Sequence, residues 1–357
     1  MNILVVGKFY TEGFARHIAE TLTDLGHAVR RFEPGLRSKP ARSRLQHRLH
    51  QVRNVLYEST DSLPAVRARR MATLWDCADE APLDVVIVAY DFLWPAEVAE
   101  LKRRTGAAVA LWYPDAITNF SRAFFMNAAY DGLFFKDPFT LHALGDVLAS
   151  PVHYLPECFN PARHWLPDDR IGSDPVYACD ITTAGNLHSW RVACFKHLVD
   201  YDVKIWGNPA PLWMAAGAVS GMHQGRGVYN EDKVRAFRGA KIVLNNLHYG
   251  EIWGVNVRCF EAAGAGAFQM VDARPSLIDL FEDGREIVSF RGMSDLRRQI
   301  DHWLPRGDER RAIADAGMRR AHAEHTYAHR LQVLIDTLGG RTKGHPVPGI
   351  EVRRRAH

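Results

Sequence analysis

The sequence has no apolar run that approaches the length of about 18 residues needed to span a bilayer. Its 5 cysteines are widely spaced and form no C-x-x-C pair, and no group of His and Cys has the spacing of a zinc site. The first residues, MNILVVGKF, lack the basic and small-residue features of a secretory signal. These absences argue against a membrane-spanning, secreted or zinc-stabilised protein. We expect reduced thiols in a cytoplasmic protein.

Length and apolar patterning predict two domains. At 357 residues, the chain exceeds what one hydrophobic core usually supports. Short apolar runs alternate with amphipathic segments in both halves, which is typical of parallel sheets covered by helices. In the first half, strands are expected at 2–6, 28–32, 84–89, 107–113, 132–135 and 152–155. In the second half, they are expected at 177–184, 203–206, 241–245, 267–271 and 286–290, and the last helix at 327–338.

We predict an α/β fold of two Rossmann-like domains that face an inter-domain cleft. The expected N-terminal domain, 1–165, carries an Arg-rich helical insertion at 41–81. The expected C-terminal domain covers 166–338, and a flexible basic tail follows at 339–357. Ligands of open parallel sheets bind outside the carboxyl ends of the strands, so the site should lie in the cleft. Dehydrogenases, binding proteins and glycosyltransferases all use such halves, so the fold alone does not name the chemistry.

The loop after the first strand runs from Gly7 to Gly13. It has no G-x-G-x-x-G, and bulky Phe9 and Tyr10 stand where a pyrophosphate would need a close approach to the backbone. Dinucleotide binding is therefore not expected here. A strand-end loop of this kind should still face the cleft, and we assign Gly7, Glu12 and Gly13 to substrate binding.

The first strand of the second half ends at Gly185-Asn186, and a helix follows. Backbone N–H groups at the start of that helix would favour a phosphate, and Arg191 could add a charge-assisted contact. We therefore assign Gly185, Asn186 and Arg191 to a bound nucleotide. A surface arginine in the first turn of the helix is the alternative for Arg191.

The block from 250 to 267 is the most informative part of the sequence. Its small residues allow a helix to pack tightly on a sheet, and Asn256, Arg258 and Glu261 fall in the first turns of that helix. A carboxylate such as Glu261 suits ribose hydroxyls, and an arginine such as Arg258 suits a diphosphate. A surface ion pair between Arg258 and Glu261, which are i, i+3 neighbours on a helix, is the alternative.

Several ordered blocks resemble one family. The run N-x-R-x-F-E-A-A-G-A-G-A-F at 256–268, LIDLFEDGREIVSF at 277–290, ERRAIADAG at 309–317 and HTYAHRL at 325–331 resemble the C-terminal domain of CgeB-like glycosyltransferases, the spore-maturation-protein type. The likeness extends over about 84–338 and is strongest beyond Lys241. It implies a GT-B fold with the acceptor mainly on the N-terminal half and a nucleotide-sugar donor on the C-terminal half. It also implies a last helix that crosses back onto the first domain, and transfer without a metal or other cofactor.

The resemblance also indicates where the sugar donor would bind. Related retaining enzymes use two glutamates separated by seven residues, and Glu261 matches the second of them, at the ribose. The position of the first is occupied by Trp253, which leaves Glu251 as the nearest replacement and assigns it to substrate binding. Inference of retaining stereochemistry is weakened accordingly.

Asp115 is the best candidate for a catalytic base. It follows an expected strand in the run Trp112-Tyr113-Pro114-Asp115, where a base could reach an acceptor hydroxyl in the cleft. A plain turn aspartate after proline is the alternative. Weaker candidates for the base are Glu12, His188, His248 and Glu251.

One D-x-D motif, Asp200-Tyr201-Asp202, could suggest a metal-diphosphate site. It precedes its strand and so lies on the side opposite the expected cleft, which favours a turn. We therefore expect no metal ligands.

Basic residues gather between Arg30 and Arg70, where 11 Arg and Lys stand against 3 acidic residues. A solvated helical face is the simplest interpretation. The alternatives are contact with an anionic membrane or a phosphorylated acceptor. Nucleic acid binding is not expected, because interleaved aromatics and recognition motifs are lacking.

Together, these features predict a glycosyltransferase of hexosyltransferase type that moves a sugar from a nucleoside diphosphate to a glycan, lipid-linked or protein acceptor. It would be cytoplasmic, with possible membrane association through the Arg-rich segment. A nucleotide-sugar epimerase on the same fold and a non-catalytic sugar-nucleotide or glycan-binding protein are the alternatives.

Overall fold

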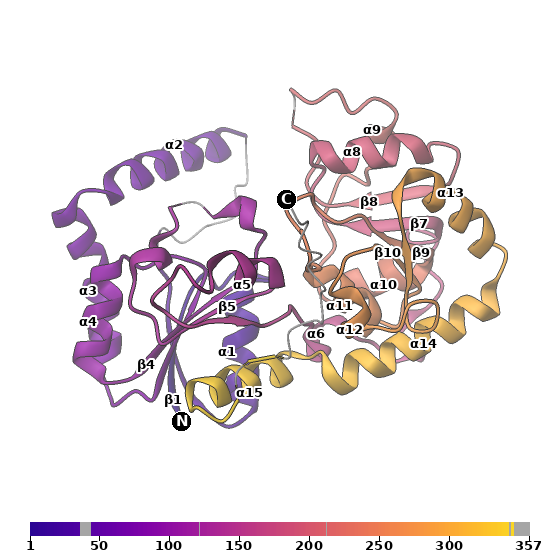
Figure 1. The fold of residues 1–357 in the computed structure, drawn as a ribbon. Helices are drawn as coiled ribbons and strands as arrows, with labels where there is room; N and C mark the ends of the chain where they lie inside the picture. The colour runs from indigo at the N-terminus through magenta and orange to yellow at the C-terminus, as the bar shows by residue number, and fades with distance from the viewer. Residues whose placement is uncertain (36–43, 121, 212, 343, 346–357) are drawn as a thin grey trace, which may run out of the picture.

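The structure, a computed structural model, describes residues 1–35, 44–120, 122–211, 213–342, 344 and 345. Its strands form two separate parallel sheets, each flanked by helices (Figure 1). The first sheet has the order β2-β1-β3-β4-β5-β6 and the second the order β11-β10-β9-β7-β8. Two parallel α/β layers confirm the predicted fold class.

The first sheet is built from continuous apolar strands, as expected for a sheet covered on both faces. Two clusters of buried side chains lie on its two faces and include Val86 and Val88 on one and Val85 and Ile87 on the other. Its strands are β1 (Asn2–Val6), β2 (Ala28–Phe32), β3 (Val85–Ala89), β4 (Ala108–Tyr113), β5 (Gly132–Phe135) and β6 (Val152–Tyr154). Helices α1 (Phe14–Asp24), α4 (Pro95–Thr105) and α5 (Pro138–Leu144) connect them, with the 3-10 turns η1 (Ile117–Asn119) and η2 (Phe124–Asn127).

The segment predicted as a helical insertion forms two helices with different roles. Helix α3 (Pro64–Asp79) buries Met71, Leu74 and Ala78 in the core of the first sheet, so it is the crossover helix between β2 and β3. Helix α2 (Arg44–Asp61) instead projects beyond the sheet (Figure 1). Positions 36–43, which include Arg37, Lys39 and Arg42, lie outside the described residues.

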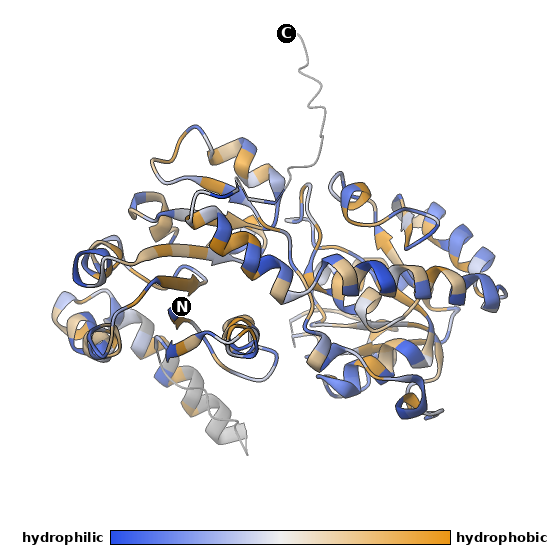
Figure 2. Ribbon diagram, turned by 90° about the horizontal axis from the view of Figure 1, so that it is seen from below, coloured by the Kyte–Doolittle hydropathy of each residue, from blue (hydrophilic) through white to orange (hydrophobic). Residues whose placement is uncertain are grey.

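The second sheet is likewise parallel and flanked by helices (Figure 1). Its strands are β7 (Cys179–Ala184), β8 (Val203–Trp206), β9 (Ala240–Asn245), β10 (Gln269–Asp272) and β11 (Val288–Phe290). The longer helices are α8 (Ser189–Phe195), α10 (Glu231–Gly239), α11 (Val257–Gly264), α13 (Gly292–Trp303), α14 (Gly307–Glu324) and α15 (Tyr327–Leu338). The short elements α6 (Pro161–His164), α7 (Asp168–Ile171), η3 (Lys196–Leu198), α9 (Val219–Met222) and α12 (Leu277–Leu280) complete it. Apolar residues lie along the strands, and hydrophilic residues are common on the outer helices (Figure 2).

The last helix returns to the first domain. Helix α15 begins at Thr326, whose side chain caps it by accepting a hydrogen bond from the His329 N–H. Its residues Tyr327, Leu331, Leu334 and Ile335 join a core cluster with β1, β3 and α1. Within the described ranges, no helix is both long and apolar enough to cross a bilayer. Of the predicted basic tail, residues 343 and 346–357 lie outside the described residues.

Candidate functional site

An open pocket of about 250 Å³ lies between the two sheets. It is where the carboxyl ends of parallel strands from both domains converge, the position that open sheets offer to ligands. Its lining is polar and comes from both domains: Tyr10, Glu12, Phe14, His17, Tyr90, Pro114, Asp115, Lys136, Glu157, Glu251, Asn256, Val257, Arg258, Glu261 and Tyr327. Six predicted site residues therefore meet in one place.

Arg258 holds the strand ends on the C-terminal side of the pocket. Its Nε atom donates to the Ala184 carbonyl oxygen at 2.5 Å, and a second guanidinium nitrogen donates to Asn245 Oδ1 at 2.9 Å. Asn245 in turn donates to Asn256 Oδ1 at 3.0 Å. The guanidinium is therefore fixed at the ends of β7 and β9, in the first turn of α11.

Arg191 lies beside Arg258, and the alternative that it is a plain surface arginine is wrong. It is buried, donating to the Asn186 carbonyl oxygen at 2.8 Å and to Asn246 Oδ1 at 3.3 Å. A Cβ atom on Gly185 would lie 2.5 Å from an Arg258 nitrogen and 2.7 Å from an Arg191 nitrogen, so this glycine makes room for both. Gly185, Asn186 and Arg191 adjoin the pocket without lining it.

The two guanidiniums form a concentrated positive charge. Burial lowers the pKa of Arg191, and the neighbouring Arg258 lowers it further. Burial also lowers the pKa of Arg258, against the opposing effect of Glu261. Among the described residues, no carboxylate lies within ion-pair distance of either guanidinium. Such a pair suits an anion that could accept charge-assisted hydrogen bonds.

Glu261 does not pair with Arg258, so the i, i+3 ion-pair alternative is wrong. Its Oε1 atom accepts a hydrogen bond from Lys233 Nζ at 2.9 Å and lies 3.6 Å from His164 Nε2. Burial alone would raise the pKa of Glu261, but the charges of Lys233 and His164 hold it below its ordinary value. Glu261 therefore stands in the pocket as a carboxylate.

Glu12 joins the two domains through the same lysine. Its Oε1 atom accepts from the Asn230 N–H at 2.7 Å, and its Oε2 atom accepts from His164 at 3.0 Å and from Lys233. Both Glu12 (φ 64°) and Asn230 (φ 50°) have left-handed backbone conformations that non-glycine residues seldom adopt. Strained residues of this kind persist only when surrounding contacts hold them.

Replacing Glu12 by alanine is expected to lower the free energy of unfolding by about 3 kcal/mol, because Lys233 loses one of its two buried partners. Burial opposes the effect, but the hydrogen bond from His164 and the charge of Lys233 hold the pKa of Glu12 far below its usual range. The stabilisation is therefore present at neutral pH and is lost as the pH falls below the unfolded value of about 4.3. Urea denaturation at several pH values measures it.

Glu20→Ala, on the helix α1 that follows the loop of Glu12, is the matched control. Glu20 pairs with Arg16 and Arg163, whose side chains are 33 and 37 % exposed, and such a pair contributes at most about 1 kcal/mol. Equal losses of stability in the two variants would contradict the importance given to the Glu12 contacts.

Glu12, His17 and His164 also bring possible metal-ligating atoms within 4.8 Å of one another. The same atoms take part in a network of hydrogen bonds and ion pairs. The Asn160 N–H points at His164 Nδ1 at 3.4 Å, so His164 Nε2 carries the proton that it donates to Glu12. The Lys233 ammonium occupies the same Glu12 oxygen. The cluster is a network of hydrogen bonds and ion pairs.

Asp115 reaches the pocket from the first domain. It follows β4, and its Oδ1 atom accepts from the Ala116 N–H at 2.8 Å, which fixes the carboxylate at the strand end. It is accompanied by Tyr90, which follows β3 with φ 72°. Both features fit a functional strand end.

Several pocket or network residues were not predicted from the sequence, among them Lys136, Glu157, His164 and Lys233. Lys136 and Glu157 come shortly after β5 and β6, so the strand-end rule that selected Asp115 could have found them. His164 and Lys233 lie on helices and carried no comparable signal.

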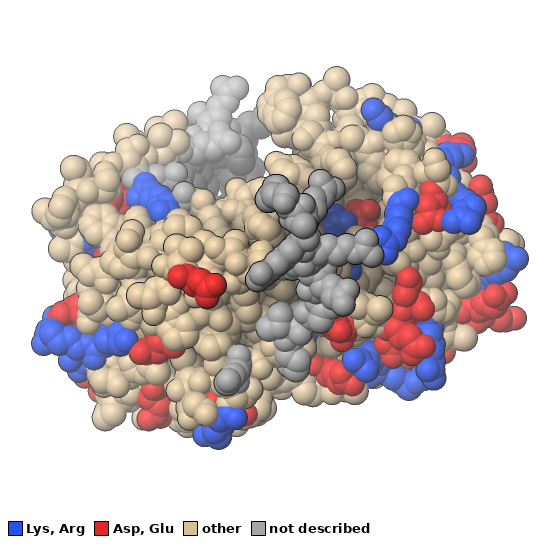
Figure 3. Space-filling view, viewed as in Figure 1, with Lys and Arg blue, Asp and Glu red and all other residues tan. Residues whose placement is uncertain are grey.

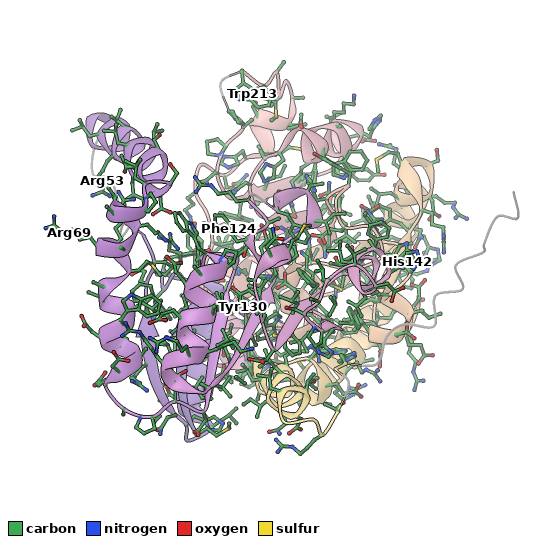
Figure 4. All side chains as sticks on the ribbon, turned by 60° about the vertical axis from the view of Figure 1, so that its left-hand side comes forward. Arg53, Arg69, Phe124, Tyr130, His142 and Trp213 are labelled. Carbon is green, nitrogen blue, oxygen red and sulfur yellow. The ribbon has the colours of Figure 1, made fainter. Side chains whose placement is uncertain are left out.

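Trp253, which stands where the resemblance leads us to expect a first glutamate, has a packing role. Its N–H donates to Asp137 at 3.2 Å, and its ring packs edge-on against Phe139 at 5.3 Å. The ring of His142, labelled in Figure 4, also lies 5.3 Å from the Trp253 ring. Trp253 therefore holds the second domain against α5, while Glu251 lines the pocket in its place.

Gly7 and Gly13, which we assigned to substrate binding, are closely packed outside the pocket lining. A Cβ on Gly7 would lie 2.5 Å from Ala15 Cβ, and one on Gly13 would lie 2.8 Å from the carbonyl oxygens of Lys8 and Tyr10. Neither residue lines the pocket. Their role is to let α1 pack closely and the loop carrying Glu12 turn.

Two of the weaker base candidates, His188 and His248, and the D-x-D motif lie outside the pocket lining, whereas Glu12 and Glu251 are part of it. His188 and His248 face each other, with ring centroids 6.5 Å apart, outside the pocket lining. Asp200 pairs with Arg297 at 2.5 Å, and Tyr201 donates to Asp301 at 2.6 Å. The motif precedes β8, at the edge of the sheet away from the pocket.

Comparison with known proteins identifies this architecture. Residues 189–336 match a family model described as glycosyl transferase-like. HepE from Anabaena, solved in complex with UDP, superposes with a TM-score of 0.67 at 12% identity, over 95% of this chain and 100% of that one. The chain has the GT-B fold. No curated protein sequence matches it.

Other solved structures share the GT-B architecture. AviGT4, a glycosyltransferase involved in avilamycin A biosynthesis, superposes with a TM-score of 0.60 at 14% identity, over 95% of this chain and 99% of that one. Sucrose-phosphate synthase from Thermosynechococcus elongatus gives 0.59 at 12% identity, over 96% and 100%. In this GT-B chain, the matched residues 189–336 include Arg191, Lys233, Arg258 and Glu261. The C-terminal half thus carries a glycosyl transferase-like domain.

Proposed function

We propose that the protein is a glycosyltransferase that moves a hexose from a nucleoside diphosphate to an acceptor hydroxyl. One observation carries the proposal: Arg191 and Arg258 lie together at the strand ends, with no carboxylate paired to either among the described residues. Negative charge develops on a departing diphosphate, and fixed donors aimed at that charge lower the barrier to transfer. The glycosyl transferase-like match and the UDP-bound neighbour support the same reading.

Each pocket residue then has a role in the transfer. Glu261 accepts hydrogen bonds from the ribose hydroxyls, while Asn256 and the start of α11 lie beside the diphosphate. Asp115 removes the proton from the acceptor hydroxyl as it attacks the anomeric carbon, and the diphosphate leaves. The arginines supply the positive charge, so no metal is needed in this scheme.

Nucleotide binding is the first test. A thermal-shift screen against UDP, GDP, TDP and CMP is expected to raise the unfolding midpoint with one diphosphate, because binding to the folded state stabilises it by about 2.7 kcal/mol at 100 times the dissociation constant. A donor-hydrolysis or transfer assay then follows, with and without EDTA, and its rate should be unaffected by the chelator. An unfolding midpoint that no nucleotide raises would contradict the proposal.

The CgeB-like subtype belongs to the same proposal. It rests on the motifs between 256 and 331, which place Arg258 and Glu261 in the pocket. Product analysis without an acceptor distinguishes transfer from epimerisation of the donor, since an epimerase would change the sugar with no acceptor present.

We also propose that α2 contacts an anionic membrane, although not through all the predicted arginines. Arg67 and Arg70 form ion pairs with Asp61 on α2, and Arg67 also pairs with Glu97. Their charges are therefore already neutralised within the protein. Instead, Leu49, Val52, Val55 and Leu56 on α2 are 57 to 61 % exposed. Arg53 lies on the same helix, and Arg69 projects outward from α3 (Figure 4). Exposed apolar rows with basic neighbours are typical of helices that lie on lipid.

The face shown in Figure 3 carries both basic and acidic side chains, so charge alone does not mark a binding surface. The exposed apolar residues of α2 are therefore the better target for a test. The double variant Leu49→Ser, Leu56→Ser is expected to reduce binding to phosphatidylglycerol vesicles about tenfold or more, since two leucines no longer enter the lipid. Co-sedimentation measures it. Val147→Ser, at a still more exposed site away from α2, is the control. Unchanged binding by the double variant would exclude this surface.

A further inference from the structure

Three ionisable side chains, Lys136, Glu157 and Glu251, meet at one wall of the pocket. Lys136 follows β5, Glu157 follows β6, and Glu251 comes from the loop between β9 and α11. Lys136 Nζ lies 2.8 Å from Glu251 Oε1 and 3.5 Å from Glu157 Oε1. Their exposed fractions are only 3, 5 and 5 %, and all three line the pocket. Buried charges of this density, drawn from both domains, need a structural or functional reason.

Their hydrogen bonds are incomplete. Glu251 Oε2 is buried and has no hydrogen-bond partner among the described residues. Glu157 comes within ion-pair distance of Lys136, but no hydrogen bond joins its carboxyl group to a described residue. Buried polar atoms in native proteins are nearly always satisfied. Unused hydrogen-bonding capacity at a pocket wall therefore indicates a polar ligand.

The two carboxyl groups offer opposite halves of a hydrogen bond. Burial raises the pKa of Glu157 to about 8, although Lys136 opposes the shift, so this carboxyl carries a proton at neutral pH and can donate. Glu251 accepts from Lys136 through one oxygen and has the other free to accept. A sugar hydroxyl both donates and accepts, so it matches this pair.

The charge of the group limits which sugar it could take. Lys136 balances one carboxylate, and Asp115 adds a further negative charge to the same lining. Arg191 and Arg258, which could balance a second anion, meet beside Gly185 at the end of β7, where the diphosphate is proposed to bind and to take up their charge. A carboxylate on the sugar ring would therefore meet like charge.

We propose that Lys136, Glu157 and Glu251 form the sugar subsite, and that it selects a neutral sugar over one carrying a carboxylate. This inference rests on the proposed function. Glu157 and Glu251 contact the sugar hydroxyls, and Lys136 is a positioning residue that holds Glu251 in place. The subsite is complete only when the two domains face each other, because Glu251 comes from the second domain and Lys136 from the first.

Isothermal titration with UDP-glucose, UDP-glucuronic acid and UDP tests the subsite. If the thermal-shift screen selects guanine, GDP-mannose, GDP-mannuronic acid and GDP take their places. Wild type is expected to bind the neutral conjugate at least about tenfold more tightly than the uronate. Glu157→Ala and Glu251→Gln should weaken binding of the neutral conjugate about tenfold and leave the diphosphate within about twofold.

Glu157→Gln is the conservative control, because its amide keeps a donor in the same place, and it should retain binding of the neutral conjugate. If Glu157→Ala does not fold, Glu157→Leu, which fills the space without polar atoms, replaces it. Lys136→Met should weaken binding of the neutral conjugate as much as Glu251→Gln does, again without loss of diphosphate binding.

The possible results separate the two proposals. If wild type binds no nucleotide at all, the proposed function fails and the subsite with it. If nucleotides bind but the Glu157 and Glu251 variants treat the sugar conjugate and the diphosphate alike, the subsite alone is wrong. If the uronate binds as tightly as the neutral conjugate, the charge selection is wrong.

Discussion

Arg258→Ala is expected to reduce the rate of sugar transfer about 100- to 1000-fold, the usual effect of removing one fixed donor to developing charge. The side chain is held by the Ala184 carbonyl and Asn245, so it is already positioned before a ligand arrives. Its loss leaves Arg191 as the remaining guanidinium beside the diphosphate. Steady-state kinetics with the nucleotide sugar identified by the screen measures the change in kcat.

Two controls accompany this variant. Arg258→Lys keeps the charge but loses the planar fork that reaches both anchors, and should recover only part of the rate. Arg285→Ala removes an arginine whose side chain is 75 % exposed and should leave kcat unchanged. Free guanidinium in the assay should partly restore Arg258→Ala, which a merely misfolded variant would not show. A full rate in Arg258→Ala would remove this residue from the mechanism.

Glu261→Ala is expected to weaken nucleoside diphosphate binding about 10- to 100-fold, because hydrogen bonds to a charged group contribute about 1.5–3 kcal/mol. The fold should survive, since Lys233 keeps its contact with Glu12. Calorimetric titration measures the affinity, and urea denaturation measures the accompanying loss of stability.

Glu261→Gln is the matched variant, because it keeps the shape and one acceptor oxygen but loses the charge. Its affinity for the nucleoside diphosphate should fall between those of wild type and Glu261→Ala. Glu309→Ala, on an exposed position of α14, should bind as wild type does. Unchanged affinity of Glu261→Ala for every nucleoside diphosphate is the result that would overturn the ribose assignment.

The fold and much of the pocket could be predicted because both follow from local rules. Apolar runs predicted the strands, and the rule that ligands bind at carboxyl strand ends led to Asp115. The chemistry of the helix after Gly254 and its family resemblance led to Arg258 and Glu261. The strand-end rule applied to β5 and β6 would have added Lys136 and Glu157, but neither stood in a motif. Those two residues were missed for want of a signal, although the rule covers their positions.

The partners of these residues could not be predicted from the sequence. Glu12 meets His164 and Lys233 across separations of 152 and 221 residues, which no periodicity records. The sequence likewise suggested a pair between Arg258 and Glu261 from their spacing on one helix. Tertiary contacts decided otherwise, because Lys233 reaches Glu261 from a different helix and Arg258 turns to the strand ends.

The two places where the chain passes between the domains lie side by side. Phe159, in the first passage, donates its N–H to the His325 carbonyl at 3.1 Å and accepts from the Tyr327 N–H at 3.2 Å in the second. Two adjacent connections pinned together act as a door hinge does: they permit rotation about one line and resist sliding or twisting. We therefore expect any opening of the cleft to be a rotation about this contact, which would separate Glu12 from Asn230 and leave Phe159 beside Tyr327.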